Sequence, residues 1–309
     1  MIEKIIDISA EPLKISASNN LFTLKNDKDK IFTVPLNEIA CVIMAHPALF
    51  ITNHVLSELM RNNVPVIVCG SSYMPEGMMI PYTGNFNQCE RFDAQINAGA
   101  ALKKRLWQEI IISKIKMQGE LLKKIYGSDS GLLQIAKDVL SGDSSNREAW
   151  AAKIYFEAMK KDFNSGRNRE AEDQNRYLNY GYMVLRAIVS RAICGAGLHP
   201  TIGLNHHNRY NQFCLADDLM EPLRPLIDEI VIEIVRDFGS DAPLEKEIKS
   251  RLLSIYTKRL FFHKSYRSIF EVCEKIANSL MLIFVGKEKS LMLPDSIILK
   301  GESNEEEST

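Results

Sequence analysis

The pattern of the chain changes within residues 64–84, which read Val-Pro-Val-Ile-Val-Cys-Gly-Ser-Ser-Tyr-Met-Pro-Glu-Gly-Met-Met-Ile-Pro-Tyr-Thr-Gly. Before this stretch, apolar residues come in short runs separated by turn residues such as Asn19-Asn20, and this pattern is typical of β-strands. After Pro81-Tyr-Thr-Gly84, long segments repeat their apolar residues about every 3.6 positions, as amphipathic helices do. The change predicts an α+β fold, with a small β-rich N-terminal domain followed by a larger all-α C-terminal domain.

We expect three parts along the chain: a β-rich domain over residues 1–83, an α-helical domain over 84–287, and an acidic, mobile tail over 288–309. The strands expected in the first part cover residues 4–8, 13–16, 21–24, 31–34, 39–43 and 64–69. One short helix is expected between residues 50 and 60. Breaks between the helices of the second part are expected near residues 127–131, 141–145, 164–167, 195–197 and 239–243.

The composition is that of an ordinary globular protein, with 46% hydrophobic and 25% charged residues among 309. The N-terminus has no basic start followed by a long apolar core, and no apolar run is long enough to cross a bilayer. We therefore expect a cytoplasmic protein without membrane contact. The sequence contains no glycine-rich phosphate loop ending in Gly-Lys-Ser/Thr, so no motif supports an ATP-driven mechanism.

Polar residues concentrate in residues 203–225, Gly-Leu-Asn-His-His-Asn-Arg-Tyr-Asn-Gln-Phe-Cys-Leu-Ala-Asp-Asp-Leu-Met-Glu-Pro-Leu-Arg-Pro. On a helix, Asp218 and Glu221 are three apart and share one face, where their charges repel unless a cation lies between them. An imidazole from the preceding loop, His206 or His207, is a candidate third ligand, and this oxygen-rich set favours Mg²⁺ or Mn²⁺ over Zn²⁺. The alternative is that these carboxylates only stabilise a helix N-terminus through its dipole.

A second candidate is Glu148, near the start of an expected helix. Ala151 and Ala152 lie three and four positions further on and leave room for a ligand or another helix beside the carboxylate. Ser145 and Glu148 also have the spacing of a capping box, in which the glutamate side chain would bond to the start of the helix. The local sequence leaves both interpretations open.

Residues 248–270 contain no acidic residue and combine basic with aromatic side chains. The cations suit contact with DNA phosphates, and the aromatic rings suit base stacking. The candidate DNA-binding residues are Lys249, Arg251, Lys258, Arg259, Lys264 and Arg267. The alternative is a pair of helices with an apolar inner face and a solvated basic outer face.

Three segments together resemble the CRISPR-associated integrase, the catalytic subunit of spacer acquisition. They are Glu148-Ala-Trp-Ala-Ala-Lys-Ile-Tyr-Phe156, Gly203-Leu-Asn-His206 and Leu215-Ala-Asp-Asp-Leu-Met-Glu-Pro-Leu-Arg-Pro225, and they occur in the family's order. The N-terminal part also resembles the family's β-domain, so the likeness extends to about Lys287. The segment from Leu215 most resembles integrases of type II systems, which use a single large RNA-guided effector nuclease.

The resemblance implies that the β-rich domain mediates dimerisation and that the α-helical domain is catalytic. The implied metal-binding catalytic triad consists of Glu148, His206 and Glu221, with Asp218 as an acidic neighbour. The resemblance also implies Mg²⁺ or Mn²⁺ as the cofactor and a transesterification in which the 3′-hydroxyl of a short DNA fragment attacks a phosphodiester of a CRISPR array. The implied partners are DNA (the fragment and the repeat array), a second copy of the chain in a homodimer, a small ferredoxin-like CRISPR adaptation protein, and the effector nuclease of the same system.

Two other functions fit the same residues. One is a metal-dependent nuclease that hydrolyses branched or damaged DNA, with water in place of the 3′-hydroxyl. The other is a non-catalytic DNA-binding scaffold whose carboxylates serve helix ends. Products in which a DNA fragment becomes covalently joined favour integration over hydrolysis, and loss of activity without loss of DNA binding in Glu221→Ala excludes the scaffold.

Overall fold

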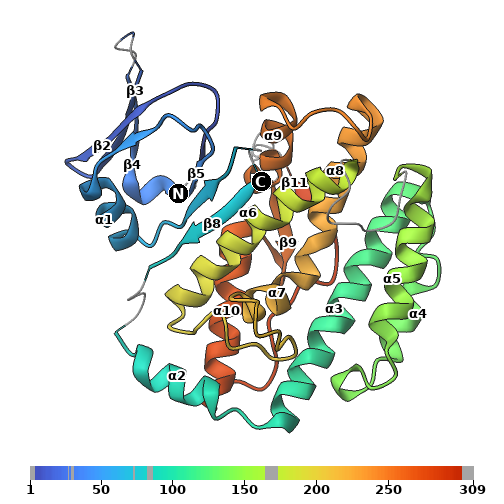
Figure 1. The fold of residues 1–309 in the computed structure, drawn as a ribbon. Helices are drawn as coiled ribbons and strands as arrows, with labels where there is room; N and C mark the ends of the chain where they lie inside the picture. The colour runs from blue at the N-terminus through green and yellow to red at the C-terminus, as the bar shows by residue number, and fades with distance from the viewer. Residues whose placement is uncertain are drawn as a thin grey trace, which may run out of the picture.

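The structure is a computed structural model that describes residues 4–26, 28, 31–71, 74–81, 86–163 and 173–300. Its N-terminal part contains two four-stranded sheets, and the larger remainder is mostly helical (Figure 1). The strands of the first sheet are, in spatial order, β1 (Lys4–Ile8), β5 (Ile39–Met44), β7 (Val66–Cys69) and β8 (Pro75–Met79). Those of the second are β4 (Ile31–Pro35), β3 (Leu21–Lys25), β2 (Lys14–Ser18) and β6 (Phe50–Ile51). The predicted α+β class is confirmed.

Strand β5 lies inside the first sheet and runs parallel to both β1 and β7. Its residues Ile39-Ala-Cys-Val-Ile43 are all apolar and all buried, because both faces of this sheet are covered. One face packs with the second sheet and α1 (Asn53–Arg61), and the other packs with the helices that follow. In β3, by contrast, burial alternates, with Phe22 and Leu24 facing the core. The first sheet is thus the layer that joins the N-terminal part to the helices.

The helical part is built around α3 (Ala100–Tyr126), a helix of 27 residues that ends where Gly127 adopts the left-handed conformation (φ 80°). The other helices of the described part are α2 (Gln88–Ile96), α4 (Leu132–Lys137), α5 (Arg147–Ala158), α6 (Gln174–Gly195), α7 (Cys214–Met220), α8 (Arg224–Phe238), α9 (Lys246–Leu253) and α10 (Ile269–Phe284). None of the helices in the described ranges is long and apolar enough to span a membrane.

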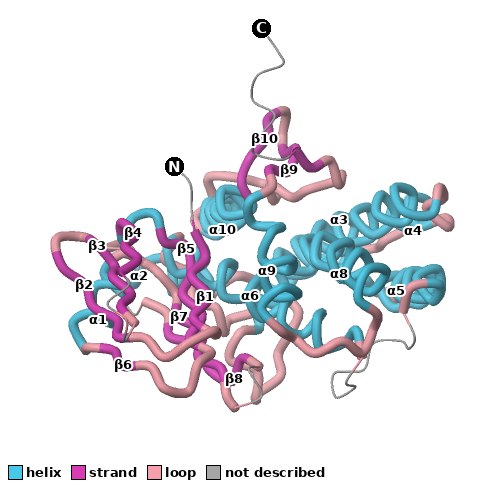
Figure 2. The backbone as a smooth tube through the Cα atoms, turned by 90° about the horizontal axis from the view of Figure 1, so that it is seen from above, coloured by secondary structure: helices cyan, strands magenta, loops and turns pink. Residues whose placement is uncertain are grey.

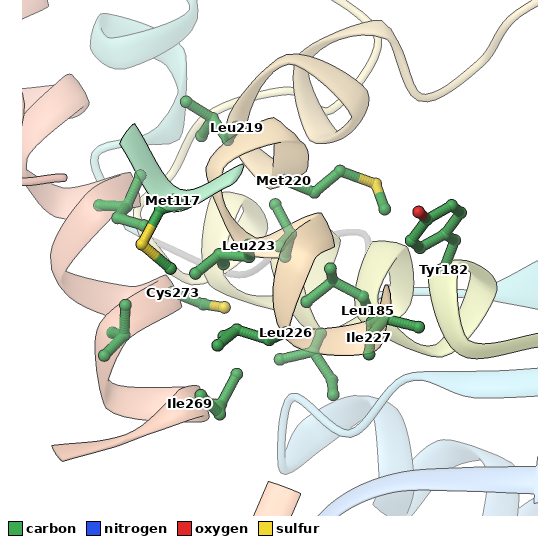
Figure 3. Close-up of a cluster of buried hydrophobic side chains, with 14 of the residues drawn as sticks. Met117, Tyr182, Leu185, Leu219, Met220, Leu223, Leu226, Ile227, Ile269 and Cys273 are labelled. Atoms are coloured by element: carbon green, nitrogen blue, oxygen red, sulfur yellow. The ribbon is translucent and has the colours of Figure 1, made fainter. Parts of the chain in front are cut away.

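Apolar side chains from several helices meet in one buried cluster, part of which is drawn in Figure 3. Met117 of α3 and Met220 of α7 lie on opposite sides of Leu223 in this view, and Leu226 of α8 lies near Ile269 and Cys273 of α10. All six are buried. Because such a core is close-packed, it fixes α3, α7 and α8 relative to one another, and these helices carry most of the site described below.

The sequence predicted an all-α C-terminal part, and this prediction is wrong. Strands β9 (Arg259–Phe262) and β10 (Ser265–Ser268) form a hairpin, and β11 (Leu299–Lys300) pairs with the other side of β9. The hairpin stands out from the helices in Figure 2. Its turn residues His263 and Lys264 have φ values of 45° and 71°, a conformation that favours glycine or asparagine. No turn signal therefore marked the hairpin in the sequence.

The segment after residue 288 packs against the helices as far as residue 300, so the predicted mobile tail is wrong for these residues. Leu291 and Ile297 are buried, and Leu291 N donates to Glu109 Oε2 at 2.7 Å. Ser113 Oγ donates to the carbonyl of Pro294. We predicted a mobile tail from the acidic composition at the end of the chain, but buried apolar residues such as Leu291 and Ile297 attach residues 289–300 to the helices. Residues 301–309 lie outside the described residues, as do the predicted domain boundary at residue 83 and the predicted break at 164–167.

Candidate active site

The ammonium group of Lys114 lies between two of the three predicted catalytic residues. Its Nζ is 2.6 Å from Glu148 Oε1 and 2.7 Å from Glu221 Oε2. Lys114 comes from the middle of α3, Glu148 from the first turn of α5, and Glu221 from the 3₁₀ turn that joins α7 to α8. Two carboxylates from distant parts of the sequence thus share one positive charge.

The Glu148 carboxylate is not used to cap its own helix. The N-terminal amides of α5 are bonded instead by Asp143, whose Oδ1 accepts from Arg147 N at 2.8 Å and whose Oδ2 accepts from Glu148 N at 3.0 Å. Asn146, at the N-cap, is in the left-handed conformation and makes no side-chain capping bond. The capping-box interpretation with Ser145 is therefore wrong, and the carboxylate of Glu148 is turned toward Lys114.

Glu221 is held in a buried position by two cations. Its Oε2 faces Lys114, and its Oε1 lies 3.0 Å from Arg224 Nε, one turn further along the chain. Burial alone would raise the pKa of Glu221, but the charges of Arg224 and Lys114 outweigh it and lower the pKa to about 2. The carboxylate is consequently ionised at neutral pH although only 7% of its side chain is exposed.

His206 is oriented by Asp218. The distance from His206 Nδ1 to Asp218 Oδ1 is 2.5 Å, and the fully buried Asp218 also accepts the backbone N–H groups of Leu204 at 2.6 Å, Asn205 at 3.1 Å and His206 at 3.3 Å. A carboxylate that accepts so many bonds leaves the proton on Nδ1, so the lone pair of the neutral ring is on Nε2. Trp107 packs edge-on against the imidazole.

The hydrogen bond that Asp218 accepts from His206 raises the pKa of the imidazole, while burial acts to lower this pKa. Gly203 permits this arrangement, because a Cβ there would lie 2.5 Å from the carbonyl oxygen of His206 and 3.0 Å from Asp218 Oδ2. Asp218 was predicted as an acidic neighbour of the metal. Its oxygens are directed to the histidine and the loop instead, so the structure gives it the role of positioning His206.

Asp217, next to Asp218, has a different contact. Arg186 of α6 meets it through two bonds, Nε to Oδ1 at 2.7 Å and Nη2 to Oδ2 at 3.1 Å, and Asn211 Nδ2 donates to Oδ2 at 2.7 Å. Asp217 thus ties the loop before α7 to α6. The three carboxylates at positions 217, 218 and 221 therefore have separate partners, which the alternative of a simple helix-dipole effect does not explain.

A cavity of about 530 Å³ opens beside these residues, lined by Lys114, Gln118, Arg186, His206, Glu221 and Arg224 among others. Its wall also includes Tyr182 and the buried Asp228, which accepts hydrogen bonds from the hydroxyls of Tyr182 and Tyr155. The wall carries basic and acidic side chains together, and Lys114, Arg186 and Arg224 are each paired with a carboxylate.

Sequence reasoning missed Lys114, although a signal was present. Trp107, Ile110, Ile111 and Met117 form an apolar stripe along α3 at helical spacing, and Lys114 falls on the same buried face. A lysine on such a face requires a buried anion as its partner. In the sequence, Arg224 is one residue of the motif from Leu215 to Pro225, and its sequence neighbours do not distinguish it from a solvated surface residue.

Only some of the predicted DNA-binding residues lie at exposed or partly exposed positions that DNA can reach. Lys249 is buried, with its Nζ 5.8 Å from the centre of the Tyr180 ring, so its prediction as a DNA contact is wrong. Arg251 pairs with Asp237 at 2.7 Å. The alternative of a pair of helices is wrong for residues 259–268, which form the β9–β10 hairpin. The other four residues lie on or beside this hairpin; they are Lys258, Arg259, Lys264 and Arg267. Their contact with DNA stays a prediction.

The donor set of the site has the chemistry of a divalent-cation site. Two carboxylates and an imidazole nitrogen suit Mg²⁺ or Mn²⁺, and the bond from Asp218 to the far side of the imidazole is the support that metal-bound histidines usually have. In this conformation the cation between the carboxylates is Lys114. Among the residues that the structure describes, no three His, Cys, Asp or Glu side chains are grouped closely enough to hold a metal ion.

Comparison with known proteins places the chain in an endonuclease family. A family model described as CRISPR associated protein Cas1 matches residues 8–254, which is more than half of the chain. The chain therefore belongs to the Cas1 family, and the predicted family is confirmed.

Relatives and solved structures agree with this assignment. The CRISPR-associated endonuclease Cas1 of Neisseria meningitidis serogroup C is 35% identical over 273 residues, which cover 87% of this chain and 88% of the relative. One of the endonucleases of this name from Francisella tularensis subsp. novicida is 25% identical, with 81% and 85% covered. In fold, a casposase bound to an integration product superposes with a TM-score of 0.77 at 18% identity, covering 93% of this chain and 92% of the casposase. A Cas1 protein from Thermotoga maritima gives 0.72 at 16% identity, covering 93% and 99%.

Proposed function

We propose that the chain is a metal-dependent DNA integrase and endonuclease that joins short DNA fragments to a CRISPR array. The observation that carries the proposal is the pair of carboxylates, Glu148 and Glu221, that meet at Lys114, with His206 lining the same cavity as Glu221 and held by Asp218 through Nδ1. The oxygens of Glu148 and Glu221 and the Nε2 of His206 would hold Mg²⁺ or Mn²⁺. A metal bound there would supply the positive charge that stabilises the reacting phosphate.

The residues around the pair have roles that follow from their contacts. Arg224 holds Glu221 in its buried position, and Asp218 holds His206. Arg186 and Arg224 line the cavity beside Asp217 and Glu221, and their guanidinium groups supply N–H donors for a DNA phosphate. In the reaction, the oxygen of a 3′-hydroxyl forms a bond to phosphorus while another oxygen leaves with its electron pair, so one phosphodiester replaces another. No nucleotide is consumed, which agrees with the lack of a phosphate loop in the sequence.

The comparisons support this proposal. The relatives from Neisseria and Francisella are named endonucleases, and the casposase of similar fold is bound to an integration product. Another chain with this fold is part of a Cas6-RT-Cas1–Cas2 complex, at a TM-score of 0.74 and 17% identity, covering 94% of this chain and 36% of that one. We propose a small ferredoxin-like adaptation protein and an RNA-guided effector nuclease as partners, in a type II system.

We also propose that the N-terminal part mediates a homodimer, as the sequence had predicted. The sheet formed by β4, β3, β2 and β6 exposes large apolar residues, with Ile31, Phe32 and Phe50 each more than half exposed and Leu21 39% exposed. Large apolar side chains exposed on one sheet are candidates for contact with another protein.

A strand-transfer assay tests the proposed reaction. Wild-type protein, the small adaptation partner, a labelled DNA fragment with free 3′-hydroxyls and a supercoiled repeat-bearing plasmid are combined with Mg²⁺ or Mn²⁺. We expect label to become joined to the plasmid, and we expect Glu148→Gln to abolish joining while DNA binding persists. Glu157→Gln is the matched control, because Glu157 lies on the same helix, is exposed and pairs only with Lys160 among the contacts seen.

The products distinguish the competing functions. Shortened strands without joined label would assign the site to hydrolysis of branched or damaged DNA. Equal joining by the wild type and Glu148→Gln would exclude Glu148 from the catalytic site, and absence of joining and cleavage despite DNA binding would favour the scaffold.

A further inference from the structure

Lys114 is placed where the proposed metal has to bind. Its ammonium group contacts one oxygen of Glu148 and one of Glu221, and its positive charge repels a divalent ion that binds to the same oxygens. Only 11% of the Lys114 side chain is exposed, so the charge cannot simply turn away into bulk water. Binding of a metal therefore requires a second buried position for the ammonium group.

Gln118 provides such a position. It lies one helical turn after Lys114 on α3, and side chains four residues apart share a helix face. Both residues line the same cavity. Gln118 is buried, with 4% exposure, and its Oε1 accepts no hydrogen bond within the described residues. A buried carbonyl oxygen without a donor is costly, which suggests that a donor reaches it in another state of the protein.

The other cation at the site is not free to take part in such an exchange. Arg224 contacts Glu221 through Oε1, the oxygen that Lys114 does not contact, and its guanidinium lies over the Tyr182 ring at 4.7 Å. Glu148 is the more accessible carboxylate, with 31% of its side chain exposed against 7% for Glu221. A metal can therefore approach from the side of Glu148 while Arg224 stays in place.

We propose that Lys114 is an internal cation that occupies the space between Glu148 and Glu221 until a divalent metal binds there, and that its ammonium group then moves to Gln118 Oε1. The inference rests on the metal site of the proposed function. It explains how the buried carboxylate of Glu221 and the part-buried carboxylate of Glu148 stay close together before metal arrives. It also makes Lys114 a competitor of the metal in the absence of DNA.

Binding of Mn²⁺ to the full-length protein without DNA tests the inference, with free Mn²⁺ measured by electron paramagnetic resonance. Lys114→Met keeps the length of the side chain and removes the charge, so Mn²⁺ should bind about tenfold more tightly. Gln118→Met removes the receiving oxygen and should weaken binding about threefold, but should have no effect when combined with Lys114→Met. Lys124→Met is the matched control, since Lys124 lies on α3 and pairs with Glu229 outside the cavity. This variant should bind Mn²⁺ with the same affinity as the wild type.

Unchanged or weaker Mn²⁺ binding by Lys114→Met would overturn the inference. If that variant does not fold, Gln118→Met carries the test, and wild-type affinity in this variant would overturn the proposed receiving position. Glu221→Gln separates this outcome from failure of the metal site itself. If Mn²⁺ binding to the wild type does not depend on Glu221, the proposed site is wrong; if it does but Lys114→Met has no effect, only the inference about Lys114 is wrong.

Discussion

Replacing Glu221 by glutamine is expected to reduce strand transfer by about 1000-fold, because a charged ligand is lost at the position where the reacting phosphate is stabilised. The change also leaves Arg224, whose side chain is 21% exposed, without the ion-pair partner that lies buried beside it. Breaking a buried pair on one side typically costs about 3 kcal/mol, so we expect a lower free energy of unfolding as well. Strand-transfer rates and denaturant unfolding measure the two effects separately.

Glu229→Gln is the control for this prediction. Glu229 is also a buried glutamate, and it pairs with Lys124 at 2.5 Å, but it does not line the cavity. The control should lose stability and keep its activity. A Glu221→Gln variant that loses only as much activity as Glu229→Gln would show that Glu221 has a structural role alone.

Replacing Asp218 by asparagine is expected to have the next largest effect. The amide has one acceptor oxygen in place of two, so backbone N–H groups of residues 204–206 lose partners, at a cost of about 2–3 kcal/mol. His206 loses the bond that fixes its ring. Loss of such support typically weakens metal binding or activity by about 10–100-fold. Thermal unfolding and Mn²⁺ titration measure these effects.

The pH dependence gives Asp218→Asn a signature that general destabilisation lacks. The pKa of His206 is raised in the folded protein by its hydrogen bond with Asp218. This interaction therefore stabilises the fold fully below the ordinary histidine pKa of about 6.5. The stabilisation is lost as the pH rises through the raised pKa. The difference in melting temperature between the wild type and the variant should therefore be larger at pH 6 than at pH 9. The acid limb of the activity profile should also move to lower pH in the variant. Parallel stability curves with an unmoved acid limb would contradict the assigned role.

The sequence predicted the mixed α+β class because the local patterns agree with the tertiary environment. The continuous apolar run of β5 and the long amphipathic pattern of α3 both reflect burial that the structure shows. The hairpin at residues 259–268 was missed because its turn has positive φ at His263 and Lys264, residues that do not usually signal a turn. The packing of residues 289–300 depends on long-range contacts with α3 and β9, which no local pattern encodes.

The sequence supplied candidate residues for the site but no information on their contacts. Glu148 and Glu221 lie far apart in the chain, and only the family resemblance joined them in one site. That Asp218 serves His206 depends on a loop conformation made possible by Gly203, which spacing along a helix does not reveal. Lys114 was overlooked because a single lysine in an apolar stripe has meaning only when its two partners are known.

The central claim is that a metal at Glu148 and Glu221 contacts the reacting phosphate, and a phosphorothioate substitution tests it most directly. One non-bridging oxygen of the target phosphodiester is replaced by sulfur, and strand transfer is measured with Mg²⁺ and with Mn²⁺. Sulfur is a poor ligand for the hard Mg²⁺ and a better one for Mn²⁺. We expect one stereoisomer to lose activity in Mg²⁺ and to recover it in Mn²⁺, whereas equal activity in both metals, or full activity in the presence of a chelator, would contradict the account.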